Sequence, residues 1–153
     1  MDYTDIEKKW QDIWEKEKRF EVPNHVDGKK NAYVLIEFPY PSGKGLHTGH
    51  VRSYSAMDAV ARKKRLEGYN VLFPMGCDAF GLEAERTAIK EKKSPQEIVS
   101  RNIATFKEQL KSVGLSIDWS REISTCDPSY YKWTQWLFLQ FFKHGLAEKR
   151  YAN

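Results

Sequence analysis

The stretch that decides the fold is "AYVLIEFPYPSGKGLHTGHVRSY", residues 32–54. It opens with a short apolar run of strand-forming residues, 32–38, which Pro39 and Pro41 bring to an end. A turn rich in glycine follows. From about His47 to Leu66, apolar residues recur at helical intervals. A strand, a glycine-rich turn and a helix in this order indicate a loop that binds phosphate.

The next segments along the chain extend this unit. "NVLFPM", residues 70–75, reads as a second strand, and "GCDAFGLEAE", residues 76–85, follows it. Two strands joined through a helix predict a right-handed crossover with parallel pairing, and therefore an α/β fold. Sheets of this kind bind ligands at the carboxyl ends of their strands. We therefore expect the glycine-rich loop and the segment 76–85 to face one crevice.

Helical patterns lie on both sides of this unit. Thr4 and Glu7 have the spacing of a capping box, which predicts the start of a first helix. Ser94, Pro95 and Glu97 predict another start, with serine as the N-cap and proline as the first helical residue. The predicted segments are helices over about 5–18, 81–93 and 95–113, a polar connector over 22–31, an irregular segment or short strand over 116–125, and a last helix between Asp127 and Gly145.

Two side-chain clusters have an ordinary structural interpretation. The run Arg62–Arg65 predicts a solvated helix face, with contact to RNA phosphates as the alternative. The last helix carries an aromatic stripe that predicts core packing, with base stacking as the less favoured alternative. The members of the stripe are Trp133, Trp136, Leu137, Phe138 and Phe141.

Composition limits the class of protein. The chain has 153 residues, of which 41% are hydrophobic and 14% aromatic, so it is long enough for one globular domain with a core. The formal net charge of +4 permits an anionic partner without requiring one. No apolar run is long enough to cross a membrane, and no signal peptide is recognisable. Cys77 and Cys126 form neither a zinc spacing nor a disulfide framework, so a reducing cytoplasm is expected.

The glycine-rich loop fits neither common nucleotide-binding fingerprint. It lacks the Walker A pattern, and Gly43, Gly45 and Gly49 miss the dinucleotide spacing by one residue. His47 and His50 are three residues apart, so their rings share one face of the first helical turn. There they can stabilise charge that develops on a phosphate, beside a glycine that lets a ligand approach the backbone. Ordinary surface histidines or a two-histidine metal pair are the alternatives, and the loop's place directly after a strand favours phosphate.

Several spaced motifs together carry a family resemblance. "EFPYPSGKGLHTGHVRSY", residues 37–54, resembles the His-x-Gly-His signature region of class I aminoacyl-tRNA synthetases, and Phe38–Gly43 resembles the leucyl version in particular. Other segments agree with that family in the same order, so the resemblance runs through nearly the whole chain. These segments are "EKKWQDIWE" at 7–15, "LFPMGCDAFGLEAE" at 72–85 and "IDWSREISTCDPSYYKWTQWLFLQFFKHGLAEKRYAN" at 117–153.

The resemblance implies a reaction and a set of site residues. The reaction is ATP-dependent activation of leucine to leucyl-adenylate, followed by transfer to tRNA(Leu), with Mg²⁺ accompanying ATP and no metal bound by the protein. His47 and His50 would be catalytic, and Asp78 would hold the leucine ammonium group. The implied ATP-binding residues are Pro41, Ser42, Gly43, His47, Gly49 and His50, and the implied leucine-binding residues are Phe38, Pro39, Tyr40 and Asp78.

The chain also departs from the family pattern. Cys77 and Glu83 stand where the family usually has tryptophan and proline. The second, lysine-bearing catalytic loop and the editing and anticodon-binding regions are not among these 153 residues. We therefore expect an N-terminal fragment, with a helix and connector at 1–30 and the first half of a Rossmann-like catalytic domain, up to the family's insertion, at 31–153.

Such a fragment is expected to be weakly active or inactive alone. An uncovered parallel sheet edge predicts marginal stability, self-association or dependence on a complementary C-terminal chain. Two other functions stay open at this point. One is a small nucleotidylyltransferase, which also uses a His-x-Gly-His loop, and the other is a non-catalytic binding module derived from a synthetase.

Overall fold

The computed structural model describes residues 2–41 and 45–151. Ser42 and Gly43, both predicted to bind ATP, lie outside the described residues. Helices and strands alternate in the predicted order. Their bounds are α1 Thr4–Lys16, β1 Asn31–Tyr33, α2 Thr48–Leu66, β2 Asn70–Leu72, β3 Pro74–Cys77, α3 Leu82–Glu91, α4 Pro95–Ser112, β4 Asp118–Ser124 and α5 Pro128–Lys143.

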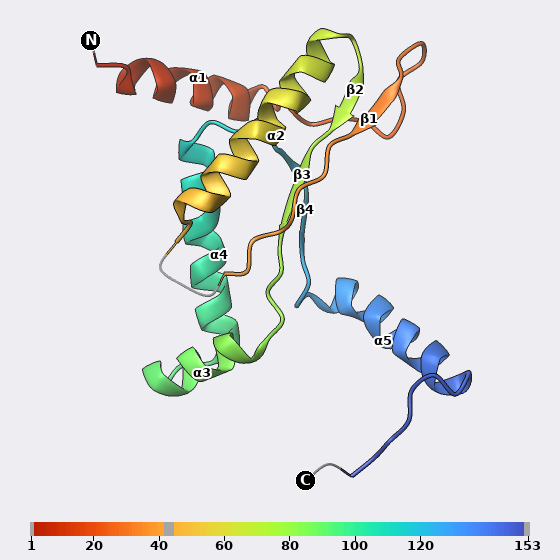
Figure 1. Cartoon of the computed structure of the whole chain (residues 1–153). Coiled ribbons are helices and arrows are strands. Elements are labelled where there is room, and N and C mark those ends of the chain that lie inside the picture. The colour runs from red at the N-terminus through yellow and green to blue at the C-terminus, as the bar shows by residue number, and fades with distance from the viewer. Residues whose placement is uncertain (1, 42–44, 152–153) are drawn as a thin grey trace.

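The strands pair in parallel, as predicted. β1 pairs with β2, with Asn31 opposite Asn70, and β3 pairs with β4, with Cys77 opposite Ser124. These pairs are two separate two-stranded sheets, and in Figure 1 α2 and α4 lie together on one side of the strands. The segment 116–125, which the sequence left as irregular or strand, contains β4.

The first strand is shorter than predicted. Regular pairing stops at Tyr33, whereas the apolar run continues to residue 38. The Val34 N–H donates to the Leu72 carbonyl at 2.9 Å, and beyond this bond the chain runs on outside any strand. Apolar alternation reports which side of an extended segment is buried, and it does not report whether the backbone hydrogen bonds form a regular ladder.

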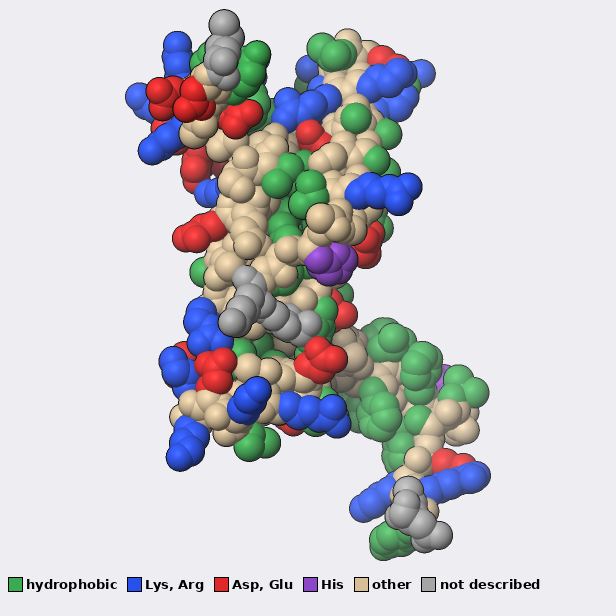
Figure 2. Space-filling view, turned by 60° about the vertical axis from the view of Figure 1, so that its left-hand side comes forward, with side chains coloured by type: hydrophobic (Ala, Val, Ile, Leu, Met, Phe, Trp, Pro, Cys, Tyr) green, Lys and Arg blue, Asp and Glu red, His purple; other side chains and the backbone are tan. Residues whose placement is uncertain are grey.

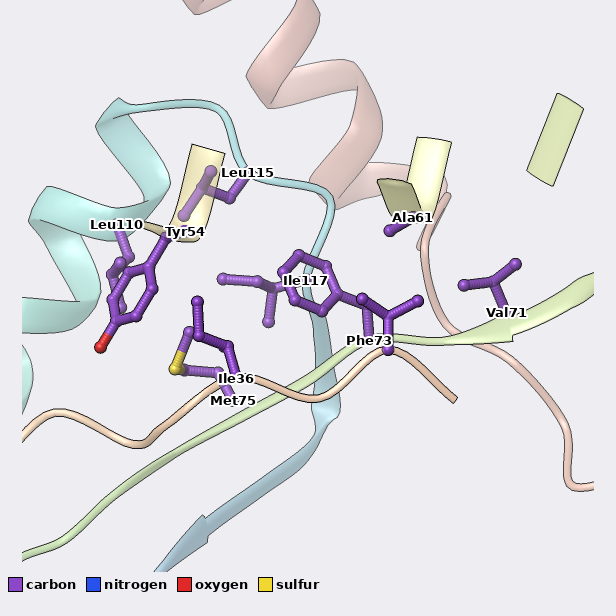
Figure 3. Close-up of a cluster of buried hydrophobic side chains, with 10 residues drawn as sticks. Ile36, Tyr54, Ala61, Val71, Phe73, Met75, Leu110, Leu115 and Ile117 are labelled. Carbon is purple, nitrogen blue, oxygen red and sulfur yellow. The ribbon is translucent and has the colours of Figure 1, made fainter. Parts of the chain in front are cut away.

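The larger of two buried clusters joins the extended segments to α2 and α4. Val34 and Ile36 alternate along the chain after β1, so both side chains face the helices. Figure 3 shows the side chains of this core converging from several elements. Its fully packed members are Val34, Ile36, Tyr54, Ala61, Val71, Phe73, Met75, Leu110, Leu115 and Ile117.

The helix starts are partly as predicted. The Ser94 hydroxyl accepts a hydrogen bond from the Glu97 N–H at 3.2 Å, and Pro95 is the first residue of α4. The predicted capping box of the first helix is wrong. The carboxylate of Asp2 accepts from the Thr4 N–H at 2.9 Å, so the cap comes from a residue further upstream.

The basic run on α2 is not wholly a solvated face, so that prediction is wrong for its two arginines. Arg62 donates to Asp58 at 2.7 Å, and Arg65 donates to the Ser116 carbonyl at 3.0 Å. Asp58 also accepts from the Ser116 N–H at 2.7 Å. The arginines are three residues apart and share a helix face that is turned toward the segment before β4. The two lysines between them pair with a glutamate on the same helix.

The prediction that the aromatic stripe is part of the core is wrong. Trp133 and Trp136 are 64% and 55% exposed, and the other members of the stripe are exposed too. Figure 1 shows α5 projecting away from the strands, and Figure 2 shows hydrophobic side chains gathered over it. Periodicity reports an apolar helix but not what covers it. No helix in the described part of the chain is long and apolar enough to span a membrane.

Candidate functional site

Two segments that are distant in sequence meet at the carboxyl ends of the strands. The Asp78 N–H, directly after β3, donates to the Pro39 carbonyl at 3.0 Å. Pro39 is completely buried, and Pro41 is buried close by. The Asn102 side chain, on α4, donates to the Pro41 carbonyl at 2.7 Å. The structure therefore brings the prolines of the first loop against the segment after β3, as the βαβ pattern predicted.

Two glycines make room for the aromatic residues of this loop. A Cβ added to Gly76 would lie 2.8 Å from the ring of Phe38, and one added to Gly81 would lie 2.6 Å from the Tyr40 hydroxyl. Real Cβ atoms do not approach other atoms this closely, so both positions need glycine for this packing. The hydroxyl of Tyr40 is buried and has no hydrogen-bond partner among the described residues. Phe38 therefore lies against the backbone of β3, and Tyr40 lies against the backbone of the segment after it.

The two histidines meet at the start of α2. His47 is the N-cap residue, and its Nδ1 accepts a hydrogen bond from the Gly49 N–H at 3.1 Å. Nδ1 of His50 accepts from the His47 N–H at 3.2 Å. The rings are stacked, with centroids 3.8 Å apart and an angle of 23° between their planes. The three-residue spacing predicted this shared face.

These hydrogen bonds fix the tautomer of both rings. A nitrogen that accepts a hydrogen bond carries no proton, so each neutral imidazole has its proton on Nε2. Partial burial, assisted by the neighbouring His47, lowers the pKa of His50, and the nearby Glu37 carboxylate opposes that shift. His50 is therefore neutral near pH 7. Because each Nδ1 accepts a hydrogen bond, each ring of the pair has its Nε2–H as the remaining donor.

Backbone N–H groups at the start of a helix usually bind anions, but two at the start of α2 already have partners. The N–H groups of His47 and Gly49 are bonded to the rings. A Cβ on Gly49 would lie 2.9 Å from the His47 ring, so this glycine makes room for the imidazole cap as well as for a ligand. The anion-binding capacity of this end therefore rests mainly on the imidazole Nε2–H groups.

Helix α4 holds the glycine-rich loop on both sides, at Pro41 and at Leu46. The sequence did not predict this support. Asn102 holds the Pro41 carbonyl, and the Gln109 side chain accepts from the Leu46 N–H at 2.7 Å. The ring of Phe106, between these two on the same helix, lies edge-on to His50 at 6.2 Å. The sequence does contain a signal for this support, because Asn102 falls on the apolar face of the predicted helix. A polar side chain at such a position needs a hydrogen-bond partner.

Asp78 is an exposed carboxylate without a cationic partner among the described residues. Its Oδ1 accepts a hydrogen bond from the Thr125 hydroxyl at 3.2 Å. Cys77, one residue earlier, is buried, and burial with the nearby Glu122 raises the pKa of its thiol to about 12. That thiol is therefore protonated and unreactive. Glu83 is exposed in the first turn of α3, where a negative charge suits the helix dipole.

Two hollows in the described part of the chain lie apart from these residues. One of about 960 Å³ and another of about 590 Å³ run along α1 and the end of α4, and Trp14 lines both. Neither includes any predicted ATP- or leucine-binding residue. Within residues 2–41 and 45–151, no three metal-ligating side chains cluster.

Sequence comparison gives a consistent family. A family model described as class I tRNA synthetases (I, L, M and V) matches residues 9–152. The leucine–tRNA ligase of Alkaliphilus oremlandii (strain OhILAs) is 60% identical over 146 residues, and that of Thermotoga maritima is 56% identical over 148. The matches cover 95% and 97% of this chain, but only 18% of each relative. The chain thus spans less than a fifth of the length of these relatives.

Solved structures of the same family resemble this chain as well. The Agrobacterium radiobacter K84 agnB2 LeuRS, solved as a LeuRS–tRNA–LeuAMS ternary complex, matches with a TM-score of 0.82 and 41% identity, over 92% of this chain and 18% of that one. The methionyl-tRNA synthetase of Mycobacterium tuberculosis, in complex with methionyl-adenylate, matches with a TM-score of 0.67 and 31% identity, over 76% and 22%. These matches confirm the predicted α/β fold with parallel strands.

The family match, the parallel fold and the homology to the N-terminal portion of leucine–tRNA ligases lead to one assignment: the chain belongs to the class I tRNA synthetases (I, L, M and V).

Proposed function

We propose that the strand ends of this chain bind ATP and leucine for the synthesis of leucyl-adenylate, as part of a leucine–tRNA ligase. The observation that carries the proposal is the stacked pair of His47 and His50, which lies at the start of α2. Pro39, in the loop before this helix, accepts a hydrogen bond from the Asp78 backbone N–H. Donors for a phosphate and an acceptor for an ammonium group thus lie on connected segments.

The histidines act on the α-phosphate of ATP. As the leucine carboxylate attacks that phosphorus and pyrophosphate leaves, negative charge grows on the phosphate oxygens. The two Nε2–H groups donate hydrogen bonds to this charge, which stabilises the transition state without a covalent intermediate. Gly49 keeps the His47 ring in place. The remaining proposed ATP-binding residues are Pro41, Ser42 and Gly43.

The amino acid binds on the other side of the same loop. The Asp78 carboxylate, which has no other cation among the described residues, takes the leucine ammonium group. Phe38, Pro39 and Tyr40 line the amino-acid pocket, held against β3 and the segment after it by the two glycines. An apolar wall beside one fixed carboxylate suits an α-amino acid with an aliphatic side chain.

Class I synthetases use ATP. Here Mg²⁺ would be held by the phosphate oxygens of ATP and by water, in the way this ion is usually bound. tRNA(Leu) is the proposed second substrate, and a complementary C-terminal chain is a proposed partner. Two further statements also stay predictions. One is the boundary between the N-terminal helix and connector and the catalytic half-domain, placed between residues 30 and 31, and the other is the cytoplasmic location.

Calorimetry with a non-hydrolysable leucyl-adenylate analogue tests this function. Replacement of both His47 and His50 by alanine is expected to weaken binding by at least about tenfold, since each lost bond to a charged group is worth about 1.5–3 kcal/mol. Asp78→Asn is expected to weaken binding by a similar factor. The matched control replaces His25 and His144, which lie outside the site, and should bind like the wild type.

Unchanged binding by the His47 and His50 variant would contradict the proposal. A wild-type affinity for an isoleucyl-adenylate analogue equal to that for the leucyl-adenylate analogue would contradict the leucine assignment. The family assignment decides against a small nucleotidylyltransferase. A chain that binds a physiological partner normally after both histidines are replaced would instead be a non-catalytic module.

A further inference from the structure

Thr125 lies directly after β4 and contacts the segment that follows β3. Its backbone N–H donates to the Cys77 carbonyl at 3.0 Å, which continues the pairing between the two strands. Its hydroxyl oxygen accepts a hydrogen bond from the Ala79 N–H at 2.8 Å and stands 3.2 Å from Oδ1 of Asp78. Thr125 therefore makes hydrogen bonds to three successive residues, 77–79.

The first of the hydroxyl contacts fixes the direction of the second. Because the Thr125 oxygen accepts from a backbone N–H, its single proton is free to point toward Asp78. An ionised carboxylate is acceptor-only, so the hydroxyl must be the donor in that bond. This bond is charge-assisted, which makes it stronger than a bond between neutral groups.

The bond with Thr125 involves only one of the two carboxylate oxygens of Asp78. Oδ1 is held by Thr125, and Oδ2 has no hydrogen-bond partner within the residues that the structure describes. The Asp78 side chain is exposed, so without Thr125 it would sample several rotamers. With Thr125, the carboxylate is held in one orientation and Oδ2 is left for an incoming cation.

We propose that Thr125 is a positioning residue for the amino-acid substrate, which holds the Asp78 carboxylate in the orientation that binds the ammonium group. This proposal rests on the proposed role of Asp78. Thr125 itself touches no substrate, and its contribution is preorganisation, which lowers the entropy lost when the ligand binds.

Two substitutions at this position separate the hydroxyl from the rest of the side chain. Thr125→Val keeps the shape and removes the donor, and Thr125→Ser keeps the donor and removes the methyl group. Two ligands complete the design: the leucyl-adenylate analogue, and the same analogue without its ammonium group. The second ligand reports any general damage to the pocket, including the loss of the bond to the Ala79 N–H.

The expected result is selective. Thr125→Val should weaken binding of the ammonium-bearing analogue by about five- to tenfold, the usual effect of one hydrogen bond to a charged group after preorganisation is lost. Its affinity for the analogue without ammonium should stay within about twofold of wild type, and Thr125→Ser should bind both ligands as the wild type does. In an Asp78→Asn background, Thr125→Val should have no further effect on the ammonium-bearing analogue.

Three results would overturn the proposal: equal loss for both ligands, loss that persists in the Asp78→Asn background, or no loss at all. The Asp78→Asn variant alone distinguishes this failure from failure of the proposed function. If Asp78→Asn binds the ammonium-bearing analogue as well as wild type does, Asp78 does not hold the ammonium group, and the role of Thr125 falls with it. If Asp78→Asn loses affinity and Thr125→Val does not, only the role of Thr125 is refuted.

Discussion

At the scale of the residue, His47 and His50 each have a structural and a chemical role. Each Nδ1 caps a backbone N–H at the start of α2, and each Nε2–H remains available as a donor. The sequence could predict that the rings share a face, because that follows from a spacing of three. It could not predict the stacking or the tautomers, which depend on backbone groups whose positions only the fold supplies.

The pKa of His50 is the first residue-level prediction. Burial and the neighbouring His47 lower it, so His50 should titrate below the ordinary histidine value in an NMR titration of its ring protons. Because the unfolded chain takes up this proton at a higher pH than the folded chain, folding should lose stability as the pH falls below about 6.5. His50→Gln identifies the resonance and should reduce that acid sensitivity. Titration of His50 at or above the ordinary value would contradict this.

Gly49 gives a second residue-level prediction. In Gly49→Ala, the new Cβ would lie 2.9 Å from the His47 ring, so the ring must move and the cap is lost. We expect binding of the leucyl-adenylate analogue to fall by about tenfold, the effect of one lost charge-assisted bond. Ser55→Ala, on the exposed face of the same helix, is the matched control and should leave the affinity unchanged. Equal affinities for the two variants would refute the spatial argument.

At the scale of the element, α2 is tied to the segment before β4 by charge as well as by the core. Asp58 accepts from the Ser116 N–H and from Arg62 on its own helix. Ser116 is completely buried, and Asp58 is nearly so. Asp58→Ala would leave the backbone N–H of Ser116 without its partner and the arginines without their counter-charge. This tie fixes the helix whose other end carries the two histidines.

We expect Asp58→Ala to lower the free energy of unfolding by about 2 kcal/mol, because it leaves the buried Ser116 N–H without its hydrogen-bond partner and removes a half-exposed ion pair with Arg62. Chemical denaturation measures this change. Glu67→Gln removes two exposed ion pairs, with Lys63 and Lys64, at the end of the same helix and should have little effect. A similar loss of stability in both variants would show that the ion pairs of Asp58 and Glu67 contribute alike.

Most element types could be predicted from the sequence, because caps and periodicity are local. Ser94 and Asp127 begin helices as predicted, since each side chain reaches a backbone N–H two or three residues ahead. The bounds of β1 and the cap of α1 were wrong. Pairing and capping at these two sites depend on neighbours that the local pattern does not specify. The same limit explains why Asn102, Gln109 and Thr125 were missed in the site.

At the scale of the whole molecule, α5 is the helix whose apolar side chains the rest of the described chain leaves uncovered. Its large apolar side chains are exposed, and its described aromatic contact with the rest of the chain is between Tyr131 and Phe80, at 5.8 Å. A helix that is apolar on most sides is stable in water only when other surfaces cover it. Sequence periodicity could not reveal this, because it gives the apolar character of a helix without its surroundings.

This surface predicts self-association. Sedimentation velocity should show an average mass that rises with protein concentration, and replacement of Trp133 and Trp136 by glutamine should reduce that rise. Tyr33→Gln, which removes a comparably exposed aromatic residue from β1, is the control and should not. A wild-type chain that stays monomeric over the whole concentration range would contradict this prediction.

The most direct test of the account is a crystal structure of this chain with the leucyl-adenylate analogue bound. We predict that the group replacing the phosphate lies within hydrogen-bond distance of Nε2 of His47 and His50, and that the ammonium group contacts Oδ2 of Asp78. An analogue bound elsewhere, for example in the hollow of about 960 Å³ beside α1, would contradict the central claim.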